Sequence, residues 1–143
     1  MRLFADECIP IREFVRWREA NEGRFAPLEC RHMHDWTDGP GLSDDVWVSR
    51  LQQADPHWLV LTADLARGGR AGDPRLPAIL PAAAVTAVFL TPSVHGLRAA
   101  EKMAVVESLL PRLRVAYAGP RGQRYKIQLS TTGEPVFRQW DLR

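Results

Sequence analysis

The sequence has few cysteines, few lysines and no long apolar run. Only two cysteines occur, Cys8 and Cys30, and no apolar stretch of signal-peptide length precedes them. We therefore expect a cytoplasmic protein with reduced thiols, and a Cys8–Cys30 disulfide is the less favoured alternative. The longest apolar stretch, AILPAAAVTAVFL, is interrupted by Pro81 and Thr86 and is too short to span a bilayer, so no membrane contact is expected.

The chain has 19 lysine and arginine residues, and only Lys102 and Lys126 are lysines. The net charge of +2 neither requires nor excludes a nucleic-acid partner, because only the clustering of charge matters. Neither a GxGxxG pattern nor a P-loop pattern is present, which leaves little support for a nucleotide cofactor.

Apolar and polar residues alternate along the chain in a way that predicts one α/β domain over residues 1–143. A length of 143 residues and a hydrophobic content of 45% suffice for one core. The patterns predict strands at 2–6, 28–34, 57–62 and 84–91, and helices at 10–21, 43–54 and 96–110. Strands that alternate with helices favour a mostly parallel sheet flanked by helices.

The last part of the chain has a different pattern. The segments RVAYA, RYKIQLS and EPVFRQW are strand-like, and the turns GPRG and TTGE separate them. Pro111 is expected to end the preceding helix. We therefore predict an α/β core at 1–113 and a C-terminal β extension at 114–143, whose hairpin either adds to the sheet or caps it.

Acidic residues follow three of the predicted apolar segments. Asp6 and Glu7 end the first strand, Asp64 follows the third strand, and Asp44 and Asp45 begin the second helix. Parallel strands bring their carboxyl ends to one edge of a sheet, where carboxylates from neighbouring strands can share a cation. Oxygen ligands favour Mg²⁺ or Mn²⁺, and such a cation supports phosphodiester hydrolysis by an activated water.

The same acidic residues also have a purely structural interpretation. Asp44 and Asp45 complement the dipole of the helix that they begin, and Asp64 can start a turn. Asp44 is the better ligand candidate of the two, because it lies three residues before Trp47 on the buried face of the helix. Spacing alone leaves both interpretations open.

Three segments, LFADECIP, LSDDVWVSRL and WLVLTADLARG, together resemble the PIN-like nuclease domains, which include the VapC-type toxin ribonucleases. The resemblance covers about residues 1–65 and implies a parallel sheet of strand order 3-2-1-4-5. It also implies an Mg²⁺- or Mn²⁺-dependent endoribonuclease. Its implied metal ligands and catalytic acids are Asp6, Asp44 and Asp64, with Thr62 and Glu7 in assisting roles.

Two positions depart from the family pattern: Cys8 replaces a small polar residue, and Ala66 stands where many relatives have a further acid. Ala66 favours the alternative of a catalytically weak module that binds RNA or a protein. The resemblance alone implies a small antitoxin partner and a homodimer. Arg67 and Arg70 either hold RNA phosphates beside the metal or belong to a solvated loop.

The four histidines do not form a convincing metal-ligand set. His32 and His34 alternate in a predicted strand but lack further ligands at suitable spacing, while His57 and His95 are isolated. A structural or exposed position is the favoured interpretation for them.

Overall fold

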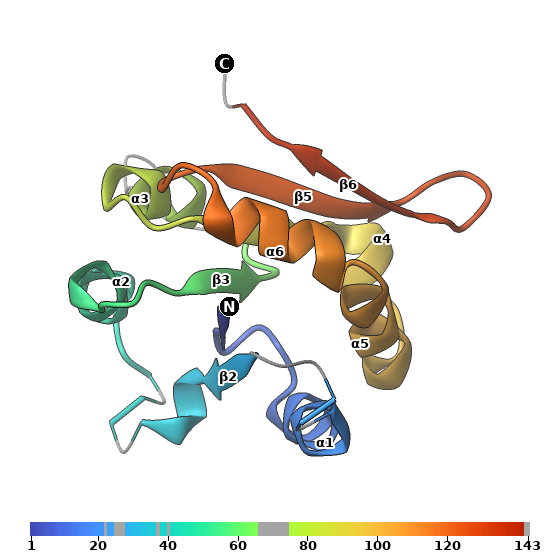
Figure 1. Ribbon diagram of the computed structural model, residues 1–143, viewed down its shortest axis with the longest axis horizontal. Helices are drawn as coiled ribbons and strands as arrows, with labels where there is room; N and C mark the ends of the chain where they lie inside the picture. The colour runs from blue at the N-terminus through green and yellow to red at the C-terminus, as the bar shows by residue number, and fades with distance from the viewer. Residues whose placement is uncertain (22, 25–27, 37, 40, 66–74, 142–143) are drawn as a thin grey trace.

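The computed structural model describes residues 1–21, 23–24, 28–36, 38–39, 41–65 and 75–141 (Figure 1). Six strands form one sheet in the order β2-β1-β3-β4-β5-β6. Neighbouring strands are parallel except β6, which is antiparallel to β5. The strands are β1 (Arg2–Ala5), β2 (Glu29–His32), β3 (Leu59–Thr62), β4 (Ala87–Leu90), β5 (Arg124–Leu129) and β6 (Pro135–Gln139).

Helices connect the strands and cover both faces of the sheet. None of those described combines the length and hydropathy needed to cross a membrane. The helices are α1 (Ile11–Asn21), the short 3₁₀ helix η1 (Met33–Asp35), α2 (Asp44–Gln53), α3 (Leu76–Ala82), α4 (Pro92–His95), α5 (Ala99–Ser108) and α6 (Leu110–Ala118).

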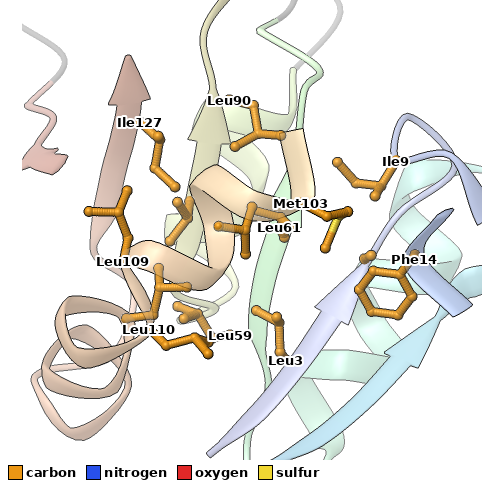
Figure 2. Close-up of a cluster of buried hydrophobic side chains, with 14 of the residues drawn as sticks. Leu3, Ile9, Phe14, Leu59, Leu61, Leu90, Met103, Leu109, Leu110 and Ile127 are labelled. Atoms are coloured by element: carbon orange, nitrogen blue, oxygen red, sulfur yellow. The ribbon is translucent and has the colours of Figure 1, made fainter. Parts of the chain in front are cut away.

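Alternation along each strand creates two hydrophobic cores, one on each face of the sheet. Leu3 and Ala5 of β1 pack in the core formed with α1, α5 and α6, whereas Phe4 packs in the core formed with α2 and α3. Figure 1 shows α2 and α3 on one side of the sheet, with α1 and α5 on the other. Figure 2 shows the first core, in which Leu61 of β3 and Met103 of α5 take part.

The α/β class and the mostly parallel sheet are confirmed, but the strand order implied by the resemblance, 3-2-1-4-5, is wrong. Helix α1 carries the chain from β1 to β2, and α2 then returns it to β3 on the other side of β1. On one side of β1 the sheet therefore has a single strand, β2, where the predicted order has two. In a doubly wound sheet of this order, the direction of winding reverses between β1 and β3, and ligands bind at that point.

The segment 114–118 is helical, so the predicted strand RVAYA and the predicted helix end at Pro111 are both wrong. Helix α5 ends at Ser108, and Pro111 lies in the first turn of α6, where its missing N–H costs nothing. Leu113 and Ala116 are buried at helical spacing, whereas Val115 is 74% exposed. The hairpin of β5 and β6 extends the sheet, because β5 pairs in parallel with β4.

Two helical valines provide a matched test of this packing. Val106 of α5 is fully buried, and we expect Val106→Ala to lower the free energy of unfolding by about 2 kcal/mol or more, since a cavity remains. Val115→Ala removes the same atoms from an exposed site on α6 and should change stability by less than about 0.5 kcal/mol. Urea unfolding of both variants measures the difference, and equal losses would contradict this placement of α6.

Candidate functional site

Asp6 lies directly after β1, at the carboxyl edge of the sheet and beside β3. Its backbone N–H donates to the carbonyl oxygen of Leu61 over 3.3 Å, which continues the pairing of β1 with β3. Its side chain is only 4% exposed. The chain then turns, and the Cys8 N–H donates to Asp6 Oδ1 over 3.0 Å. The carboxyl group is thus fixed at the point where the winding of the sheet reverses.

Thr62 links Asp6 to the segment that carries Asp64. The Thr62 hydroxyl donates to Asp6 Oδ2, and Thr62 Oγ1 in turn accepts the Asp64 backbone N–H over 3.0 Å. Thr62 is fully buried as the last residue of β3, while Asp64 is half-buried. This hydroxyl holds two acidic residues from neighbouring strands at one edge, as the sequence pattern predicted for parallel strands.

The carboxyl groups of this edge affect one another electrostatically. The pKa of Asp6 is raised from 3.8 to about 7, mainly because the group is buried; the hydrogen bonds from Thr62 and Cys8 oppose this rise, and the charges of Asp64 and Asp44 add smaller contributions to it. Asp6 therefore keeps its proton to a much higher pH than an exposed aspartate does. Asp6 is thus close enough to Asp64 and to Asp44 for both charges to act on it.

Glu7 and Asp44 connect the turn after β1 to the start of α2. The exposed Glu7 accepts the Gly41 N–H at Oε1 over 3.3 Å. Asp44 is half-buried in the first turn of α2 and accepts the Trp47 indole N–H at Oδ1 over 3.0 Å, whereas Asp45 is exposed. The bond to the buried Trp47 thus holds the Asp44 side chain in place, whereas Asp45 faces solvent.

Within the described ranges, no three His, Cys, Asp or Glu side chains are gathered into a ready-made metal-ligand group. Asp6, Asp44 and Asp64 are neighbours in charge but do not form a closed ligand cage. Mg²⁺ is usually bound by one or two carboxylates together with waters and substrate phosphates, so an open acidic set suits it better than zinc.

Cys8 does not provide a thiolate at neutral pH. Partial burial raises the pKa of its thiol to about 12, and the negative charges of Asp6 and Asp64 contribute to that rise. Because only the thiolate is a strong nucleophile, the position of Cys8 beside three acids disfavours covalent cysteine chemistry. Both cysteines are free.

Three residues of the sequence prediction, Ala66, Arg67 and Arg70, lie outside the described residues. Asp64, whose N–H donates to Thr62 Oγ1, lies two residues before that part of the chain.

Two of the histidines have structural roles. His32 is buried at the end of β2, where it accepts the His34 N–H at Nδ1 and donates from Nε2 to the Ile9 carbonyl oxygen over 2.7 Å. This bond supports the turn after Asp6. His57 stacks on Tyr117 and bonds to its carbonyl oxygen.

Lys102 is a buried charged residue that was not predicted from the sequence. It is 3% exposed on α5, and its Nζ lies 3.1 Å from His95 Nδ1. A signal was present in the sequence, because Lys102 shares the helical spacing of the apolar Ala99 and Val106. A charged residue in an apolar stripe is unusual, since lysine is rarely fully buried without a partner.

Fold and site together define a doubly wound α/β protein with an acidic group at its β1/β3 switch point. Comparison with protein-family models, with curated proteins and with solved structures found no match. The chemistry of the site therefore provides the argument for function.

Proposed function

We propose that this protein is a divalent-metal-dependent endoribonuclease of the PIN-like type. The observation that carries the proposal is the Thr62 hydroxyl, which joins the buried Asp6 carboxylate to the backbone of Asp64 across β1 and β3. Three carboxylates at one sheet edge are costly without a positive charge, and a hard cation removes that cost. The order of the three sequence motifs supports RNA as the substrate class.

Asp6, Asp64 and Asp44 are the residues that would hold Mg²⁺ or Mn²⁺. The bound cation would neutralise phosphate charge and lower the pKa of an attacking water. Thr62 keeps Asp6 in position by donating to Oδ2, and the Cys8 N–H fixes Oδ1. Glu7 holds the segment before α2 close to the site by accepting from Gly41. These bonds preorganise the acids, which reduces the reorganisation that binding requires.

Mn²⁺ binding tests the cation independently of the substrate. At one hundred times the Kd, Mn²⁺ should stabilise the folded state by about 2.7 kcal/mol, which raises the Tm by about 5–10 °C. Asp44→Asn keeps the acceptor for Trp47 but removes a charged ligand, so Mn²⁺ should bind about tenfold more weakly. Differential scanning fluorimetry measures the shift at several Mn²⁺ concentrations.

Asp45→Asn is the matched control, because it removes one charge from the exposed neighbour in the same helix turn. It should leave the Mn²⁺ shift unchanged. The absence of a shift in the wild-type protein, or an equal loss in both variants, would contradict the assignment of the cation site.

A module that binds RNA or a protein without cleaving it is the second candidate. The open arrangement of the acids in the described residues favours it over a preformed catalytic cage. Wild-type protein that binds an oligoribonucleotide but neither binds Mn²⁺ nor cleaves would establish this alternative. A small antitoxin partner, a homodimer and a cytoplasmic location belong to the proposal through the resemblance and composition alone.

A further inference from the structure

A groove of about 470 Å³ lies beside the acidic group, at the carboxyl edge of β3 and β4. Asp64 and Cys8 contribute to its lining from the acidic side, and Leu90, Pro92 and His95 contribute from β4 and α4. The groove thus has a polar, charged side at Asp64 and an apolar side at Leu90 and Pro92. A groove of this composition can take a charged group together with an apolar ring.

Lys102 places a positive charge behind this groove. Its side chain is 3% exposed, and its Nζ contacts His95 Nδ1 at 3.1 Å. Across the part of the chain that the structure describes, the ion pairs join other residues, and none includes Lys102. A buried cation whose contact is a neutral ring is costly, and an anion bound nearby would reduce that cost.

The contact with Lys102 also fixes the tautomer of His95. An ammonium group has three donors and no acceptor, so His95 Nδ1 must accept the hydrogen bond. The proton of the neutral imidazole is then on Nε2. Because His95 is exposed and lines the groove, this Nε2–H is a donor for a ligand there. The ammonium polarises the ring, which strengthens the donor.

We propose that His95, oriented by Lys102, binds a non-bridging oxygen of a phosphodiester in this groove, beside the acidic group. The inference rests on the proposed function for its substrate class, an oligonucleotide. Leu90 and Pro92 provide the apolar surface against which a sugar or base packs. His95 touches the substrate, and Lys102 is a positioning residue that acts through His95.

Binding of an uncleavable probe tests His95 without reference to catalysis. The probe is a fluorescein-labelled, fully 2′-O-methylated single-stranded 12-mer in EDTA, with anisotropy as the readout. His95→Ala should raise its Kd about tenfold, because a charge-assisted hydrogen bond to phosphate is lost. His95→Gln keeps an N–H donor near the position of Nε2 and should bind within about threefold of wild type.

Arg112→Met is the matched control for charge, because Arg112 is exposed on α6 and away from the groove lining. Lys102→Met should weaken probe binding by a similar factor to His95→Ala, whereas Arg112→Met should not. A long-range ¹H–¹⁵N spectrum separates positioning from folding. The wild-type His95 ring should show the Nε2–H tautomer, and Lys102→Met should give a mixture of both tautomers.

The outcomes distinguish this inference from the proposed function. Weaker probe binding by His95→Ala supports the inference. If this is seen, but the wild-type protein does not cleave an unmodified 12-mer with Mn²⁺, only the nuclease proposal fails. Cleavage by the wild type with unchanged probe binding by His95→Ala overturns the inference alone. If wild-type protein neither binds nor cleaves, both are overturned.

Discussion

Asp6→Asn is expected to make the protein more stable at pH 8 by up to about 4 kcal/mol in the absence of metal. Burial, with smaller contributions from Asp64 and Asp44, raises the pKa of Asp6 from 3.8 to about 7 in the folded state. The unfolded chain releases this proton near pH 4, whereas the folded chain keeps it until about pH 7. The free energy of unfolding therefore falls as the pH rises from about 4 to 7.

Asparagine resembles the neutral acid and removes this dependence on pH. Its Oδ1 can accept the Cys8 N–H, and its amide can donate to the Thr62 hydroxyl oxygen, which reverses the direction of the wild-type bond from Thr62 to Asp6. Urea unfolding of wild type and Asp6→Asn between pH 4 and 8, in EDTA, measures the difference. Titration of His32 and His95, whose pKa values are lowered by burial, affects both proteins and cancels in the comparison.

Asp45→Asn again serves as the control, because an exposed carboxylate should leave the slope with pH unchanged. Parallel stability curves for wild type and Asp6→Asn would show that Asp6 titrates normally. That result would also remove the reason to place a cation beside it.

Asp64→Asn should reduce the rate of RNA cleavage by about 10³-fold, equivalent to about 4 kcal/mol of transition-state stabilisation. Asp64 follows β3 at the switch point, its N–H is held by Thr62, and it lines the groove beside Asp6. The substitution removes one negative charge and retains the shape of the side chain. Initial rates with a fluorescent oligoribonucleotide and saturating Mn²⁺ measure the effect.

The comparison variants for this experiment are His95→Ala and Asp45→Asn. Asp64→Asn should lose both Mn²⁺ binding and cleavage, His95→Ala should keep Mn²⁺ binding, and Asp45→Asn should keep both. Cleavage by Asp64→Asn at the wild-type rate would rule out a catalytic role for this carboxylate in the proposed nuclease.

Much of the site was predictable because each acid follows a strong local pattern. Asp6 and Asp64 come directly after short apolar runs, and Asp44 lies one helical turn before Trp47, which is buried. The contact of Lys102 with His95 was not predicted, because the two residues lie on different helices and the contact depends on how α4 and α5 pack. The segment 114–118 was mistaken for a strand, because its alternation of apolar and polar residues is too short to distinguish the two-residue period of a strand from the 3.6-residue period of a helix.

The sequence by itself determined the alternation of strands and helices and the chain positions at which acids follow them, because both depend on neighbours a few residues apart. Only the tertiary structure decided that β2 and β3 lie on opposite sides of β1, which places Asp6 beside Thr62. It also decided that Asp6 is buried, and burial is the main reason that its pKa is raised. These properties depend on contacts between distant segments, which local pattern does not specify.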